Sequence, residues 1–129
     1  MASRLLAVGL CASVRAVVGH PDTAAALGSG DVPVLGTPRL IALAEIATVA
    51  ALAAHLPPGQ TSVGTKISLE HRKASPIGAA VLVSAELLEV DGSKLVFSVL
   101  AADQDGALVG DGFVHRVIVD RERFLARFR

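Results

Sequence analysis

Residues 36–59 read GTPRLIALAEIATVAALAAHLPPG, and this stretch decides the fold. From 40 to 54 it consists almost entirely of Ala, Leu, Ile and Val, which predicts a helix with apolar side chains in nearly every direction. Thr37 is a favourable N-cap and Pro38 a favourable first helical residue, while the Pro-Pro-Gly run at 57–59 ends the helix. Such a helix must be covered on several sides, most simply by a sheet that curls around it.

Strands are predicted on both sides of this helix. Residues 5–19 alternate between apolar and small or polar side chains with the period of a strand. After the helix, about four strands are separated by the ASPIG turn at 74–78 and by Asp-Gly pairs at 91–92 and 105–106, which favour tight turns. The last segment, 120–129, begins with a capping Asp and could form a short closing helix.

The connection between the first strand and the long helix is rich in Gly, Pro and Asp. It covers residues 19–36, and one short helical turn is expected at 23–27. The element order is therefore strand, connection, long helix and a run of antiparallel strands, which is an α+β class. We expect a single domain over residues 1–129, with an antiparallel β-sheet wrapped around one long central helix, as in the hotdog fold.

Composition excludes several kinds of function. Lys and Arg number 12 and so do Asp and Glu, which gives no electrostatic case for nucleic acid or a membrane surface. No aromatic residue precedes Phe97, so aromatic platforms for bases are not expected. The single cysteine, Cys11, favours a reducing compartment, and the long helix is too short for a membrane span; we expect a soluble, cytoplasmic protein. The 52% hydrophobic content suggests that some apolar surface is buried between subunits.

Glu45 is the first polar residue in an unexpected place, because it lies in the middle of the apolar helix. Burying an ionised carboxylate in apolar surroundings costs several kcal/mol unless the group is paired, solvated or protonated. Such groups are often found at functional sites, where they act as general bases. Two interpretations stay open: a catalytic carboxylate, or a structural one at an open edge or paired with Arg39 or Lys66.

His71 and Thr37 are the other two candidates. In the strand expected over 61–73, one face carries Val63, Thr65, Ile67, Leu69 and His71, and the other carries Gly64, Lys66, Ser68, Glu70 and Arg72. His71 would then point toward the neighbourhood of Glu45, although a satisfied core or interface histidine is the more frequent outcome for such a residue. Thr37 would lie at the helix N-terminus, where free N–H groups suit an oxyanion. Eight helical residues rise about 12 Å, so Thr37 cannot touch Glu45 along one straight helix.

The stretch from Gly36 to Phe128 resembles the fluoroacetyl-CoA thioesterase-like family of hotdog thioesterases. The resemblance rests on the Thr37 to Glu45 spacing, on SVGTKISLEHRKASPIG at 62–78 and on VGDGFVHRVIVDRERFLARF at 109–128. It implies a homodimer, which could pair further into a tetramer, with two sites near the interface. The implied reaction is hydrolysis of an acyl-CoA to free acid and CoA, with no metal and no cofactor beyond the CoA of the substrate.

The resemblance also assigns roles to individual residues. Glu45 would be the general base or the attacking carboxylate, His71 would orient or transfer a proton, and Thr37 would support the carboxylate, water or oxyanion. Gly64 would let the thioester approach the backbone. The basic residues Arg72, Lys73 and Arg116 could meet CoA phosphates, although a solvated strand edge is the commoner role for any one of them.

One departure from the family bears on the substrate. Specialisation for a fluorinated acyl group is expected to use an aromatic cover over the acyl pocket, whereas the segment GSGDVPVLG before Thr37 has no aromatic residue. We therefore expect a short or medium acyl-CoA other than fluoroacetyl-CoA. Two further functions remain open, a non-catalytic acyl-CoA or small-ligand-binding hotdog dimer and a dehydratase, because a fold does not determine its chemistry.

Overall fold

The elements below come from a computed structural model that describes residues 6–129. In chain order they are β1 (Cys11–Val17), a 3₁₀ turn (His20–Asp22), α1 (Ala24–Leu27), α2 (Thr37–Leu52), β2 (Gln60–His71), β3 (Ala80–Asp91), β4 (Lys94–Asp103), β5 (Leu108–Asp120) and α3 (Arg121–Ala126). The long helix, the four later strands, the helical turn before α2 and the closing helix are confirmed. The first strand is shorter than the predicted span, since residues 6–10 precede it and residue 5 lies outside the described part.

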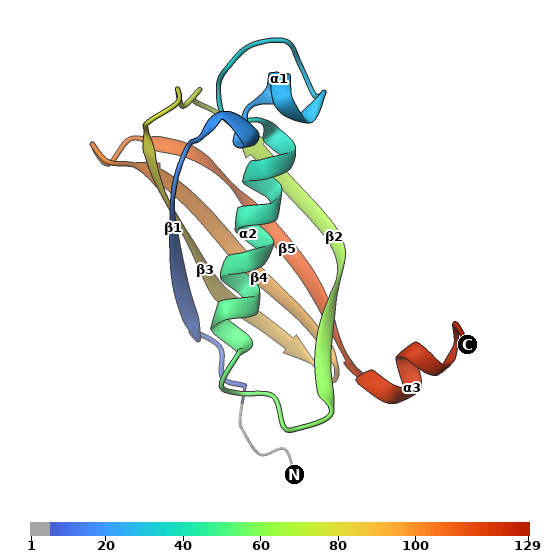
Figure 1. Ribbon diagram of the computed structural model, residues 1–129. Coiled ribbons are helices and arrows are strands. Elements are labelled where there is room, and N and C mark those ends of the chain that lie inside the picture. The colour runs from blue at the N-terminus through green and yellow to red at the C-terminus, as the bar shows by residue number, and fades with distance from the viewer. Residues whose placement is uncertain (1–5) are drawn as a thin grey trace.

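The five strands form one antiparallel sheet in the order β1-β3-β4-β5-β2, so β1 and β2 are its two edges. The sheet curves around α2, which runs along its concave face, while α3 projects from the end of β5 (Figure 1). The core between helix and sheet is built from Leu, Ala, Val and one Phe, including Leu40, Leu52, Val83, Leu87, Phe97 and Val114. This is the expected α+β hotdog arrangement.

The N-cap of α2 is Gly36 and not Thr37, which corrects the prediction. The Gly36 backbone is extended, with φ −76° and ψ 144°, and its carbonyl accepts the N–H of Leu40 at 3.1 Å. Thr37 is already the first helical residue and Pro38 the second, a place where a missing N–H costs nothing. The Thr37 hydroxyl is thereby left free for another partner.

The sheet covers several sides of α2, as expected from its apolar sequence, but one side is left open. Ile46 is 44% exposed and Val49 is 49% exposed. They neighbour Glu45 and Ala42 around a cavity of about 370 Å³ on the helix surface. Exposed aliphatic side chains grouped on one side of a helix are typical of a surface that contacts another molecule. No helix in the described part of the chain is both long and apolar enough to cross a membrane.

A β-bulge at Thr65 changes which residues of β2 face the helix. The pairing of β2 with β5 shifts register between Gly64 and Lys66, and the Thr65 hydroxyl, on the exposed side, donates to the His115 carbonyl at 3.3 Å. An extra residue in one strand inverts the alternation beyond it. Gly64 therefore lies on the same face as His71, whereas uninterrupted alternation had placed the two on opposite faces.

Candidate functional site

Thr37 and His71 form the first of two polar clusters. Thr37 is the first residue of α2 and His71 is the last residue of β2, and Thr37 Oγ1 shares a hydrogen bond of 2.8 Å with His71 Nδ1. A cavity of about 270 Å³ opens beside them, lined by Ala24, Ser29, Val34, Leu35, Thr37, His71, Arg72, Lys73 and Ala74. A hydroxyl next to an imidazole at a helix N-terminus can hold a polar substrate oxygen or a water molecule.

The His71 imidazole favours its neutral form. Burial lowers the pKa of His71, and a hydrogen bond to the Lys73 backbone opposes this effect more weakly. Its Nε2 atom is buried and has no hydrogen-bond partner among the described residues. A neutral imidazole can accept or donate one proton, so His71 is equipped to orient the Thr37 hydroxyl or to take part in proton transfer.

Glu45 forms the second cluster, together with Gly64 and Arg116. Its Oε2 atom lies 3.4 Å from Nη1 of Arg116 and occupies the space that a side chain at residue 64 would fill. The Glu45 side chain is 36% exposed and borders the cavity beside Ile46 and Val49, so the carboxylate is accessible from that cavity. An accessible carboxylate held against a cation can act as a base or as a nucleophile.

Arg116 is buried, which the sequence did not lead us to expect. It is 6% exposed, and its Nε and Nη2 atoms donate to the side-chain oxygen and the carbonyl of Ser62, at 2.8 and 3.1 Å. Desolvation lowers the pKa of Arg116, and the charge of Glu45 raises it in turn. Arg116 lies two residues from Val114 and two from Ile118, which both face the core, so alternation places it on the same side of β5. This is the signal in the sequence that could have revealed its burial.

The two clusters lie apart within one chain. Thr37 and Glu45 are eight residues apart on α2, a rise of about 12 Å. Gly64 and His71 are seven residues apart on β2, about 23 Å in an extended strand. His71 faces the helix as predicted, but it meets the start of the helix and not Glu45. The structural partners considered for Glu45 were also wrong, because Arg39 pairs with Asp22 at 2.9 Å and Glu45 pairs with Arg116.

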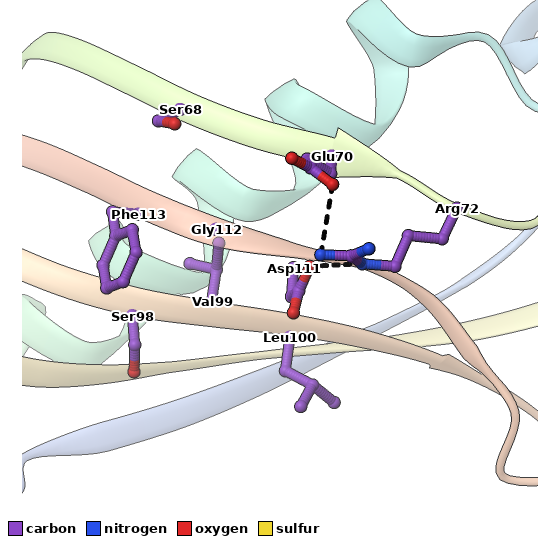
Figure 2. Close-up of a pocket in the computed structure, with 9 residues that line it drawn as sticks. All are labelled: Ser68, Glu70, Arg72, Ser98, Val99, Leu100, Asp111, Gly112 and Phe113. Carbon is purple, nitrogen blue, oxygen red and sulfur yellow. Dashed lines mark hydrogen bonds and ion pairs between the residues drawn. The ribbon is translucent and has the colours of Figure 1, made fainter.

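Two of the predicted phosphate-binding cations are paired with carboxylates. Arg72 Nε lies 2.8 Å from Asp111 Oδ1 and its Nη2 lies 3.2 Å from Glu70 Oε1 (Figure 2). These neighbours raise the pKa of Arg72, first through the hydrogen bond to Asp111. Lys73 Nζ lies 2.5 Å from Asp103 Oδ2, which raises the pKa of Lys73 in the same way. Both side chains are exposed, so a phosphate could compete for them.

An opening on the outer face of the sheet contains none of the three predicted catalytic residues. It has a volume of about 360 Å³ and is lined by Ser68, Glu70, Arg72, Ser98, Val99, Leu100, Asp111, Gly112 and Phe113 (Figure 2). Its charged groups, Glu70, Arg72 and Asp111, pair with one another, and the rest of its lining carries no reactive group. Among residues 6–129 no group of three His, Cys, Asp or Glu side chains is arranged to hold a metal ion.

Known proteins are similar to this chain in sequence and in fold. Residues 18–122 match the sequence model of the family described as fluoroacetyl-CoA-specific thioesterase. The fluoroacetyl-CoA thioesterase of Streptantibioticus cattleyicolor is 38% identical over 96 residues, which are 74% of this chain and 68% of that protein.

Solved structures agree with the sequence matches. A variant of the fluoroacetyl-CoA thioesterase in complex with acetyl-CoA superposes with a TM-score of 0.90 at 32% identity, over 96% of this chain and 97% of that one. A thioesterase superfamily member from Thermus thermophilus superposes with a TM-score of 0.91 at 26% identity, over 98% and 93% of the two chains.

Proposed function

We propose a specific reaction for this chain, which belongs to the fluoroacetyl-CoA-specific thioesterase family and is a thioester hydrolase. It hydrolyses a short or medium acyl-CoA to a free acid and CoA, with Glu45 as the central reacting group. The observation that carries this proposal is the placement of Glu45: an accessible carboxylate in an apolar helix, held against the buried Arg116 in the space left by Gly64. That placement is costly for folding alone and useful for catalysis.

The proposed chemistry divides among three side chains. Glu45 either attacks the thioester carbonyl, forming an anhydride that water then cleaves, or removes a proton from the attacking water. Thr37 supports the carboxylate, the water or the developing oxyanion, at the N-terminus of α2 where the helix dipole favours negative charge. His71 holds the Thr37 hydroxyl through the 2.8 Å hydrogen bond, or transfers a proton to the departing CoA thiolate.

The acyl group we propose is short or medium in length. Besides His71, Arg72 and Lys73, the cavity is lined by small and aliphatic side chains, with no Phe, Tyr or Trp, and no Phe precedes Phe97 in the sequence. The relatives named above include a fluoroacetyl-CoA thioesterase and a variant bound to acetyl-CoA, which supports a small acyl-CoA as the substrate class. The missing aromatic cover leads us to propose an acyl group other than fluoroacetyl.

We propose that the working enzyme is a homodimer with two composite sites. The start of the edge strand β2 lies beside Val49, on the uncovered side of α2 that also carries Ile46, so one partner can cover the strand edge and this side of the helix. In an antiparallel pair of β2 strands centred between Gly64 and His71, the Gly64 end of one copy lies opposite the His71 end of the other. Glu45 of one protomer then joins Thr37 and His71 of its partner.

The CoA moiety would lie toward the mouth of the Thr37–His71 cavity. Arg72 and Lys73 follow His71 directly and line that cavity, and both are exposed. We propose that CoA phosphates replace Asp111 as the partner of Arg72 and Asp103 as the partner of Lys73. Arg116 is buried beside Glu45, so we assign it to the thioester end of the substrate together with Gly64.

The proposal is tested by thiol release from a panel of acyl-CoAs, measured for the wild type and for Glu45→Gln. We expect turnover of at least one short or medium acyl-CoA by the wild type and a large loss of kcat in the variant. If Glu45→Gln keeps the full rate, the assignment of Glu45 is wrong. If the wild type hydrates an enoyl-CoA and releases no thiol, the dehydratase is the correct function.

A further inference from the structure

Ser62 contacts the Arg116–Glu45 pair from strand β2. The Ser62 hydroxyl oxygen accepts the Nε hydrogen of Arg116 at 2.8 Å, and the Ser62 carbonyl accepts an Nη2 hydrogen at 3.1 Å. The third nitrogen of the guanidinium, Nη1, lies 3.4 Å from Glu45 Oε2. Each nitrogen of the buried group therefore has an acceptor, and two of the three acceptors belong to Ser62.

The geometry of a guanidinium makes this arrangement directional. The group is planar and its five N–H bonds point in fixed directions, so fixing Nε and Nη2 also fixes the direction of Nη1. Arg116 is almost fully buried, so water does not readily replace a lost acceptor. The position of Glu45 is in turn bounded by Nη1 on one side and by the Gly64 backbone on the other.

We propose that Ser62 is a positioning residue, which sets the location of the Glu45 carboxylate through Arg116. The inference rests on the proposed function, in which Glu45 is the reacting group. Ser62 itself does not touch the substrate. Its hydroxyl orients Nε of Arg116 and its carbonyl orients Nη2. The remaining nitrogen, Nη1, then holds Glu45 Oε2 and so sets where the carboxylate meets the cavity.

The test compares Ser62→Ala with Ser62→Thr in steady-state hydrolysis of the best acyl-CoA. Loss of one hydrogen bond to a charged group should lower kcat about tenfold while KM stays within about twofold, because binding of CoA does not use Ser62. Ser62→Thr keeps the hydroxyl and should stay within about threefold of the wild-type kcat. The matched control is Ser68→Ala, the same change on the outer face of the same strand, and it should leave kcat unchanged.

A double-mutant cycle distinguishes a positioning role of Ser62 through Arg116 from a general disturbance of the structure. Arg116→Lys removes the planar group through which Ser62 acts, so Ser62→Ala should cost little more in that background. Equal losses from Ser62→Ala in both backgrounds would overturn the inference, as would a Ser62→Thr enzyme as slow as Ser62→Ala. If Ser62→Ala keeps its full kcat while Glu45→Gln is inactive, the positioning role is wrong and the proposed function stands. If Glu45→Gln is fully active, both are wrong.

Discussion

Replacement of Gly64 by Ala should lower the activity strongly and leave the stability nearly unchanged. The added Cβ would collide with Oε2 of Glu45 and would lie 3.5 Å from Glu45 Cδ and 3.6 Å from Arg116 Nη1. The Glu45 carboxylate is the end of a flexible, partly exposed side chain, so it can move away without disturbing the core. A displacement of about 1 Å in a reacting group costs on the order of 100-fold in rate. We therefore expect kcat to fall about 100-fold.

The stability of Gly64→Ala should change little. Gly64 does not have a positive φ, so Ala fits its backbone, and a more restricted unfolded chain favours folding by about 0.4–1 kcal/mol. The weakened Arg116–Glu45 contact costs about 1 kcal/mol, because it is already long at 3.4 Å, Glu45 is partly exposed, and Arg116 keeps both acceptors on Ser62. The net free energy of unfolding should stay within about 1 kcal/mol of the wild type.

The assay for this variant combines urea unfolding with thiol release. The control is Gly19→Ala, where a Cβ would meet only ordinary contacts at 3.5 and 3.6 Å and both measurements should match the wild type. A folded Gly64→Ala enzyme with more than half of the wild-type kcat would refute the reasoning that Glu45 must occupy this space to react.

Three further predictions concern the first cluster and the uncovered side of α2. Thr37→Val removes the 2.8 Å hydrogen bond to His71, so kcat should fall at least about tenfold and stability by about 0.5–1.5 kcal/mol, while Thr37→Ser should restore both. Burial lowers the pKa of His71 below its ordinary value of 6.5, so neutral His71 contributes to stability above pH 6.5. This contribution should be lost as the pH falls from 6.5 through the pKa of His71 in the folded protein. Urea unfolding across this range should show the loss in the wild type and not in His71→Asn; identical profiles would contradict it. Ile46→Asp places a charge on the exposed side of α2 and should give an inactive monomer in light scattering, whereas Ile77→Asp, at an equally exposed turn residue, should remain a dimer. A dimeric, active Ile46→Asp would exclude this side of α2 from the interface.

Much of the fold could be predicted because its signals are local. The apolar run at 40–54 is long enough to specify a helix, and the Asp-Gly pairs at 91–92 and 105–106 both place a glycine where the turn needs a positive φ, at Gly92 and Gly106. The short helix after Asp120 was predictable for the same reason, since the Asp120 side chain caps it by accepting the Arg123 N–H at 2.9 Å.

The site was harder to predict because it depends on contacts between distant segments. The bulge at Thr65 cannot be seen in an alternating sequence, yet it brings Gly64 to the side of Glu45. Thr37 before Pro38 has the pattern of an N-cap, and only the fold shows its hydroxyl reaching His71, 34 positions away. The role of Ser62 follows from the pairing of β2 with β5 and has no local signal at all.

The most direct test of a composite thioesterase site is complementation between two inactive variants. Glu45→Gln and His71→Asn are co-expressed with different tags, and thiol release from the best acyl-CoA is measured on the mixed population. If Glu45 of one protomer works with Thr37 and His71 of its partner, half of randomly assorted dimers are mixed and each has one intact site, which gives about one quarter of wild-type activity. No recovery in mixed dimers would show that no intact site spans the two protomers, and would contradict the account.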